Sequence, residues 1–264
     1  MNEVKHKKNN KDNKNKKDEK RGEKEAALAS SKLEKSSSKN SVFTSLTTIS
    51  IWTPGGSDGS LAALELANYI AKTFKEKVAI VELPCLGIPR LAIHVDIYDK
   101  EKNTDKLLLD LERSEYTNIY PAKYLLQISN LIGVMTINPF STPDLSMELR
   151  LNKLNTLTDF PGYLKGNLYL EGYKFVIYIL QGQIYHPLTF FGVRESDKVI
   201  LNVNYPIELG WDVSCFNKLT SSYNQAPDKF VLYSAVVNAK NLSGISDIKY
   251  IKAYKSLFKE KGER

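Results

Sequence analysis

The sequence predicts an α/β protein: a three-layer αβα domain built on a mostly parallel, twisted sheet. Short β-branched and apolar runs recur from about residue 41 onward, and segments with helical periodicity separate them. This alternation is typical of repeated strand–helix–strand units. Most of the runs are continuously apolar rather than alternating, which indicates strands with helices on both faces.

The predicted strands are the β-branched runs themselves. In chain order they are TTISIW (47–52), KVAIVEL (77–83), LIGVMTI (131–137), KFVIYIL (174–180), KVILNV (198–203) and KFVLYSAVV (229–237). The clearest helix is predicted for residues 59–75, because its apolar residues fall along one face. These residues are Ala63, Leu66, Ala67, Ile70 and Phe74.

Residues 1–40 differ from the rest of the chain in composition and charge. They hold 13 Lys+Arg against 7 Asp+Glu, a net charge of +6 out of the chain's +7, which leaves 24 against 23 for residues 41–264. With no aromatic residue and little to bury, this segment is predicted to be a disordered basic tail preceding one folded domain, residues 41–264. The tail is either a solvated linker or a weak contact for DNA or anionic lipid.

The cysteines and histidines favour neither a metal site nor a nucleophilic enzyme. Cys85 and Cys215 have no C-x-x-C spacing, which favours a reducing compartment. The histidines, His6, His94 and His186, show no metal-ligand spacing, and no nucleophile elbow accompanies a Cys215–His186 pair. No secretory signal and no stretch of about 20 apolar residues is present, so a cytoplasmic protein is expected, with a peripheral membrane contact left open. No catalytic residue and no metal ligand is predicted.

The loop after the first strand has the outline of a phosphate-binding loop. In ISIWTPGGSDGSLAALELANYIAK, residues 49–72, a strand passes through a glycine-rich bend into a helix. Such a turn is the usual anion site of a parallel sheet, because the free N–H groups and the dipole of the helix point there. The candidate phosphate-binding residues are Gly55, Gly56, Gly59 and Ser60. The same letters are also an ordinary turn signal.

This stretch resembles the start of the ParA/MinD-type ATPases, whose deviant Walker A loop follows the pattern K-G-G-x-G-K-[ST]. The paired glycines and the magnesium-ligating hydroxyl of Ser60 are matched. Pro54 stands at the signature lysine, Asp58 at the third glycine and Gly59 at the phosphate-binding lysine. The resemblance implies a P-loop NTPase-like fold and a site for ATP and magnesium, but both cations that would hold ATP are replaced.

Three later segments resemble other motifs of that family. In VAIVELPCLGIP, similar to the switch segment D-x-D-x-x-G, Glu82 and Gly87 match but Pro84 replaces the second aspartate. In YKFVIYILQGQ, similar to the Walker B strand, Ile179 stands at the magnesium-associated aspartate. That strand matches at Tyr173, Phe175, Val176 and Ile177, with Gln181 and Gly182 in place of two prolines. The third segment, ESDKVILNVNYPIELGWDVSCFNKL, is similar to the pattern A-D-x-V-[IL]-[IL]-V-x-x-P and matches at Asp197 and Pro206.

Together these segments predict a degenerate member of the family, similar to atypical TadZ and CpaE relatives. Such a protein would bind nucleotide weakly or not at all. It would act in partition, division-site placement or pilus-machinery positioning through contacts with a protein partner, and a homodimer is left open. The alternative is an active ATPase that uses substitute cations, such as Lys72, Lys75 or a lysine of a partner.

The segment YIKAYKSLFKEK, residues 250–261, is predicted to be a basic amphipathic C-terminal helix. Its apolar stripe consists of Tyr250, Ile251, Tyr254, Leu257 and Phe258. Two interpretations are open. The stripe either docks onto the sheet, or it binds a membrane surface as the helices of several MinD-like proteins do.

Overall fold

The computed structural model describes residues 45–83, 89–114, 119–138, 154–180, 182, 184–234 and 248–258. The chain divides into Met1–Val42 and Phe43–Arg264, and all described residues belong to the second unit. The predicted tail and four of the residues discussed above therefore lie outside the described residues. These four are Pro84, Cys85, Gly87 and Gln181.

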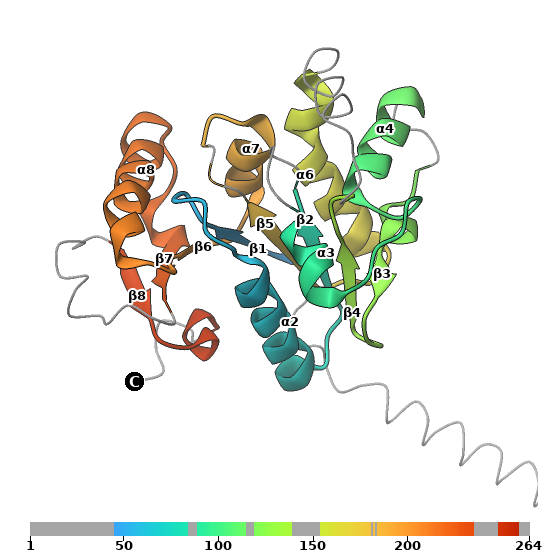
Figure 1. Ribbon diagram of the computed structural model, residues 1–264, viewed down its shortest axis with the longest axis horizontal. Coiled ribbons are helices and arrows are strands. Elements are labelled where there is room, and N and C mark those ends of the chain that lie inside the picture. The colour runs from blue at the N-terminus through green and yellow to red at the C-terminus, as the bar shows by residue number, and fades with distance from the viewer. Residues whose placement is uncertain are drawn as a thin grey trace, which may run out of the picture. The chain divides into compact units, whose positions relative to one another are not determined.

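The centre of the domain is an eight-stranded sheet of order β3-β4-β2-β5-β1-β6-β7-β8 (Figure 1). The strands are β1 (Thr47–Trp52), β2 (Val78–Glu82), β3 (Leu126–Gln127), β4 (Ile132–Met135), β5 (Phe175–Leu180), β6 (Lys198–Asn202), β7 (Phe230–Tyr233) and β8 (Lys249–Ile251). Every neighbouring pair is parallel except β3 and β4. The predicted α/β class with a mostly parallel sheet is confirmed.

Helices cover both faces of this sheet. They are α2 (Ser60–Phe74), α3 (Arg90–Val95), α4 (Thr104–Ser114), α6 (Leu154–Leu170), α7 (Pro187–Glu195) and α8 (Leu209–Ser222). The 3₁₀ turns are η1 (Pro121–Tyr124), η2 (Pro206–Glu208), η3 (Pro227–Lys229) and η5 (Tyr254–Leu257). Apolar residues of α2 and α3 pack into the core on one face, and those of α4, α6, α7 and α8 into the core on the other.

The two cores explain why the strands are continuously apolar. In β5, Phe175 and Ile177 contribute to the core beneath α2, whereas Val176 and Tyr178 contribute to the opposite core. Successive side chains of a strand point to opposite faces, so a strand covered on both sides needs apolar residues at every position. The same requirement made β1, β2, β4, β6 and β7 visible in the sequence.

The predicted helix at the C-terminus is wrong over its described part. Tyr250 and Ile251 lie in β8, which pairs in parallel with β7, and Tyr254 begins the short turn η5. Tyr254 is only 8% exposed, and its hydroxyl donates to the Ala62 carbonyl oxygen over 3.2 Å. Strand pairing and burial of this tyrosine outweigh the helical periodicity of the segment, since tertiary contacts override local preference.

The aromatic side chain at the end of this segment packs against the domain. The ring of Phe258 lies 5.0 Å from that of Phe74 and 6.0 Å from those of Tyr69 and Phe175, centroid to centroid. A membrane contact through this stripe stays a prediction, and it would require these rings to leave one another. None of the described helices is long and apolar enough to cross a bilayer.

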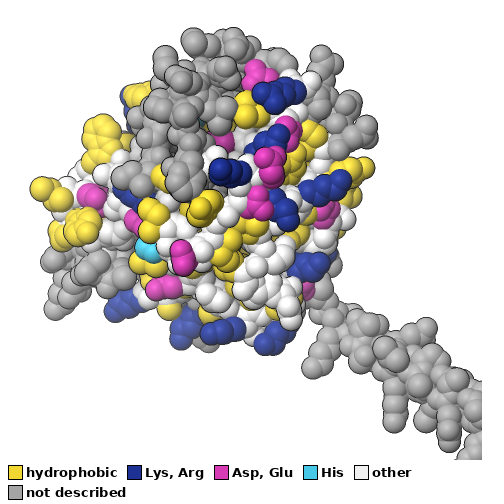
Figure 2. All heavy atoms as spheres, turned by 45° about the vertical axis from the view of Figure 1, so that its right-hand side comes forward, with side chains coloured by type: hydrophobic (Ala, Val, Ile, Leu, Met, Phe, Trp, Pro, Cys, Tyr) yellow, Lys and Arg dark blue, Asp and Glu magenta, His cyan; other side chains and the backbone are white. Residues whose placement is uncertain are grey.

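Charged side chains of both signs are mixed on one face of the domain (Figure 2). Figure 2 shows basic and acidic side chains interspersed on the face that it draws, with hydrophobic side chains between them. This pattern agrees with the nearly balanced charge of residues 41–264, which hold 24 Lys+Arg against 23 Asp+Glu. The basic excess of the chain therefore belongs to the segment before the domain.

Candidate functional site

The loop after β1 lies at the carboxyl edge of the sheet, where ligand crevices of open α/β sheets are found. β1 pairs with β5 on one side and β6 on the other. The chain crosses from β1 to β2 beyond β5, while β6, β7 and β8 extend the sheet in the other direction. The loop therefore follows a strand at which the order of the sheet reverses.

The candidate phosphate-binding residues share this loop but differ in accessibility. Gly55 and Gly56 are exposed and line a pocket, whereas Gly59 and Ser60 are buried. Gly56 has a φ of +89°, which favours glycine, and its N–H donates to the Thr53 carbonyl oxygen over 2.9 Å. The predicted set is thus split between a surface turn and a buried helix start.

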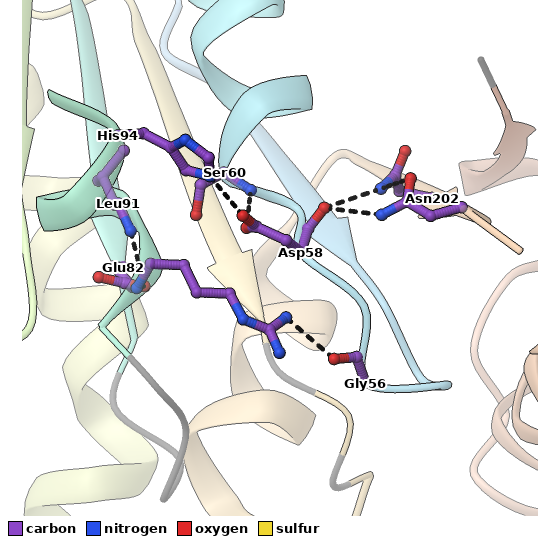
Figure 3. Close-up of polar contacts among 9 residues, drawn as sticks. Gly56, Asp58, Ser60, Glu82, Leu91, His94 and Asn202 are labelled. Carbon is purple, nitrogen blue, oxygen red and sulfur yellow. Dashed lines mark hydrogen bonds and ion pairs between the residues drawn. The ribbon is translucent and has the colours of Figure 1, made fainter. Parts of the chain in front are cut away.

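Asp58 binds the start of helix α2, where a phosphate would otherwise be expected. Its Oδ1 accepts the backbone N–H of Ser60 over 2.8 Å, and its Oδ2 lies 2.5 Å from Nε2 of His94. Its carbonyl oxygen accepts the side-chain amides of Asn204 at 2.9 Å and Asn202 at 3.4 Å. Figure 3 shows the Asp58 carboxylate directed toward Ser60 and His94, between α2 and Asn202. The loop supplies its own anion to the helix terminus.

Two further carboxylates approach the loop from η2 and α8. Asp212 Oδ1 accepts the Gly55 N–H over 2.8 Å, and Glu208 Oε2 accepts the Ser57 hydroxyl over 2.5 Å. The packing is close, since a Cβ placed on Gly55 would lie 2.7 Å from Glu208 Cβ. A backbone N–H that a P-loop would offer to phosphate is thus already bound to a carboxylate.

Helix α3 brings a third group of residues to the loop. Arg90 Nη1 donates to the Gly56 carbonyl oxygen over 2.9 Å. Glu82, at the end of β2, accepts the backbone N–H groups of Arg90 and Leu91 at 3.0 and 3.3 Å and that of Ile137 at 3.2 Å. Figure 3 shows Glu82 beside Leu91. Glu82 thus joins β2, α3 and the end of β4, which is a structural role.

The acidic side chains around the loop differ in the direction in which their pKa values are shifted. Burial opposes ionisation of Asp58, but the hydrogen bonds from His94 and Ser60 outweigh it and lower the pKa of Asp58. Burial raises the pKa of Asp212 to about 7 against the effect of the Gly55 N–H, and the charge of Glu208 adds to the rise. Burial likewise raises the pKa of Glu82 to about 7, despite its three backbone donors. Asp58 is therefore the firmly ionised member of the group.

The pocket beside the loop has a volume of about 850 Å³ and an acidic lining. Asp58, Glu65 and Glu208 line it, and Arg90 is its single cationic lining residue. The rest of the lining comes from the loop, the first turns of α2, and the segment after β6: Gly55, Gly56, Ser57, Leu61, Ala62, Asn202, Asn204, Tyr205 and Pro206, with Tyr233 from β7. The end of β6 and the residues after it thus line the pocket together with the loop, to which Asn202 and Asn204 are hydrogen-bonded.

The proposed substitute cations of this chain are not at the site. Lys72 and Lys75 lie at the end of α2 remote from the loop, and Lys72 is twelve residues beyond Ser60. A helix rises about 1.5 Å per residue, so about 18 Å separates the two backbones, more than a lysine side chain can span. This part of the prediction is wrong, and Arg90 is the cation that the sequence reasoning missed.

Magnesium and ATP do not fit the residues present. Gly59 stands at the position of the phosphate-binding lysine, and a Cβ placed on it would lie 3.0 Å from Ile51 Cγ2 and 3.8 Å from Ile179 Cγ2. Ile179 itself stands at the position of the magnesium-associated aspartate. The surroundings of Gly59 are therefore apolar. Among the described residues, no group of three or more His, Cys, Asp or Glu side chains is arranged to hold a metal ion. One feature would suit a ligand, because the buried Ser60 Oγ has no hydrogen-bond partner in the described part of the chain. A single hydroxyl group does not offset the repulsion between a phosphate and the surrounding carboxylates.

The arrangement of sheet, helices and glycine-rich first loop is that of the ParA- and MinD-type P-loop fold. No protein-family model matches the chain, and no curated protein matches it by sequence. Solved structures do match it, over about three quarters of the chain or more. The likeness is therefore one of backbone architecture rather than of sequence.

Three of these structures illustrate the likeness. The ParA family ATPase from Chlorobium tepidum TLS superposes with a TM-score of 0.60 at 13% identity, over 78% of this chain and 85% of the other. A putative plasmid partition protein from Borrelia burgdorferi B31, bound to AMPPNP, gives 0.57 at 15% identity over 83% and 93%. The MinC:MinD cell division complex of Aquifex aeolicus gives 0.53 at 10% identity over 77% and 79%. At such identities the likeness shows the fold.

Proposed function

We propose that this chain is a degenerate ParA/MinD-like protein without ATPase activity, which acts in spatial organisation through contacts with other proteins. Candidate settings are partition, division-site placement and the positioning of pilus machinery. The structures that share its fold include proteins named for plasmid partition and for cell division. Because one fold can host unrelated functions, the site has to carry the argument.

The observation that carries the proposal is the position of the Asp58 carboxylate. It binds the Ser60 N–H at the start of α2, so a nucleotide phosphate would have to displace it and then lie beside it. Two like charges about 4 Å apart repel by several kcal/mol in a partly desolvated site, even at a moderate effective dielectric. No lysine replaces the lost favourable charge among the residues that line the pocket.

Steady-state phosphate release tests this proposal. Purified full-length protein with ATP and magnesium is expected to release phosphate at the rate of buffer alone. Release above buffer that disappears in Ser60→Ala would contradict the proposal, because Ser60 is the only predicted magnesium-ligating hydroxyl in the loop. The matched control is Ser57→Ala, which removes a neighbouring hydroxyl that donates to Glu208.

One observation favours the alternative of an active nucleotide-binding protein. The Arg90 guanidinium is already at the loop, bound to the Gly56 carbonyl oxygen, and arginine binds phosphate well. In this second candidate function, Arg90 leaves that carbonyl and contacts the phosphates. One guanidinium among the pocket carboxylates Asp58, Glu65 and Glu208 makes this the weaker candidate.

A further inference from the structure

We infer that the pocket beside the loop is a docking site for a segment of a partner protein that presents an arginine or lysine among apolar residues. The inference rests on the proposed function, since it names the class of partner that the degenerate site would bind. It assigns the pocket a ligand of opposite charge to a nucleotide. Three features of the described residues carry it: unpaired carboxylates, aromatic walls and an exposed apolar rim.

Arg90 is the one cation among three acids that line the pocket, and two of these acids, Glu65 and Glu208, have no salt-bridge partner in the described part of the chain. Glu65 shares the single proton of the Tyr254 hydroxyl with the Ala62 carbonyl oxygen, at 3.3 and 3.2 Å from the hydroxyl, and Glu208 accepts the Ser57 hydroxyl at 2.5 Å. A guanidinium or ammonium group would be attracted here, whereas a phosphate, a phospholipid headgroup or a nucleic acid would be repelled.

Asp212, a buried carboxylate that contacts the loop, adds to the preference of the pocket for a cation. Asp212 is 1% exposed, and its Oδ2 has no hydrogen-bond partner among the described residues. Its other oxygen holds Gly55, a lining residue of the pocket. When Asp212 is ionised, above its raised pKa of about 7, a cation in the pocket would meet its field in addition to that of the lining acids.

The walls and rim of the pocket suit a side chain of a protein rather than a free ion. Tyr205, which is 61% exposed, lines it and has a ring that a cation can contact through its face. Tyr233 also lines it, and its ring packs against that of Tyr254 at 4.8 Å between centroids. Beside the pocket, Ile207 is 90% exposed and Trp211 is 58% exposed, although the indole N–H of Trp211 donates to the Pro54 carbonyl oxygen at 3.0 Å. Exposed tyrosine, tryptophan and aliphatic residues around a concave site are typical of protein interfaces.

Fluorescence anisotropy with defined peptides tests the inference without nucleotide. The probe is a fluorescein-labelled peptide of alternating arginine and leucine, and its counterpart has glutamate in place of arginine. The full-length protein is expected to bind the arginine peptide saturably and more weakly as salt rises, and not to bind the glutamate peptide. Equal binding of both peptides would overturn the inference.

The double variant Glu65→Gln/Glu208→Gln locates the binding. Both glutamines keep an oxygen acceptor for the hydroxyls that contact these residues now, so the fold is retained while two charges are lost. Affinity for the arginine peptide is expected to fall by about tenfold or more. The control Asp96→Asn/Glu101→Gln removes two charges outside the pocket lining, and an equal loss there would refute a specific site.

The apolar rim has its own matched pair. Ile207→Ser is expected to weaken peptide binding severalfold, whereas Leu170→Ser, at an 81% exposed position at the end of α6, is expected to leave it unchanged. Light scattering of the protein alone supplies another test. Self-association abolished by the double glutamine variant would assign the surface to a second copy of the chain and overturn the inference.

The readouts separate this inference from the proposed function. Absence of peptide binding, with phosphate release at the level of buffer, defeats the inference and leaves the proposed function standing. Phosphate release that depends on Ser60 defeats the proposed function, whatever the peptide does.

Discussion

Asp58 makes contacts through both its side chain and its backbone, and together these contacts fix the loop. Its carboxylate binds the start of α2 and His94, while its carbonyl oxygen binds the amides of Asn202 and Asn204. An aspartate two residues before a free N–H is a common way to satisfy it, as in an Asx turn. In this protein the same residue also supplies the negative charge that a bound phosphate would supply.

Replacement of Asp58 by alanine is expected to destabilise the domain by about 1 kcal/mol at pH 7, because a helix-terminal N–H loses its acceptor. The measurement is urea unfolding, with Glu101→Ala as the exposed control, expected to change stability by less than about 0.5 kcal/mol. Because the pKa of Asp58 is lowered on folding, its charge stabilises the fold above its ordinary pKa of 3.8. That part is lost as pH falls through the lower folded value. Equal stability of variant and wild type at pH 7 would show that the hydrogen bond between Asp58 and the Ser60 N–H contributes nothing to stability.

Asp212 has the opposite pH dependence. Its pKa rises from 3.8 to about 7 on folding, so between these values the folded state binds more protons than the unfolded state. The free energy of unfolding is therefore expected to fall as pH rises through this window. Asp212→Asn keeps an acceptor for Gly55 but cannot ionise, so its slope is expected to be shallower. Asp228→Asn is the control, and a slope shared by wild type and both variants would contradict the account.

At the scale of single residues, the sequence located the loop but not its contacts. Gly55 and Gly56 could be found because a glycine pair between a strand and a helix is a local pattern. The contact of Asp212 with Gly55 joins residues 157 positions apart, and only the folded sheet brings them together. Arg90 could not be connected with the loop for the same reason, since its contact spans 34 positions.

At the scale of elements, long buried strands were predictable and short edge elements were not. Every position of β5 is buried and carries an apolar or aromatic residue, and β1 is buried from Thr48 to Trp52 although it contains Thr48 and Ser50, so both strands stand out in the sequence. β3 has only two residues and β8 three, too few for a periodic pattern. β8 also lies in a stretch whose apolar spacing resembles a helix, so pairing with β7 decided its structure.

The segment after β8 gives a prediction at this scale. Phe258→Ala is expected to lower the free energy of unfolding by about 1–2 kcal/mol, because the ring packs against Tyr69, Phe74 and Phe175. Lys252→Ala, at an exposed position in the same segment, is the control. Chemical denaturation measures both. A Phe258→Ala variant as stable as wild type would mean that the segment is not docked in solution, and would reopen the membrane interpretation.

At the scale of the whole molecule, the fold resembles that of nucleotide-binding proteins, whereas the residues at the loop do not favour binding of a nucleotide. The mostly parallel sheet and the loop after its first strand resemble those of the solved ParA and MinD structures. Both features were predictable from strand and helix patterns, whereas the order of the strands was not predicted. At the loop itself, carboxylates bind the N–H groups of Gly55 and Ser60, and apolar side chains surround Gly59. The sequence showed that positions 54 and 59 hold proline and glycine rather than lysine. Only the structure showed that Asp58 and Asp212 bind backbone N–H groups of the loop.

Equilibrium titration of the full-length protein with a fluorescent ATP analogue and magnesium tests the central claim most directly. The account predicts no saturable binding below about millimolar nucleotide, a range in which the binding free energy is too small to sustain a resident cofactor. Arg90→Gln and Ser60→Ala are expected to behave like wild type. Micromolar binding that either of these substitutions, or Gly56→Val, abolishes would contradict the account and show that the loop still holds a nucleotide.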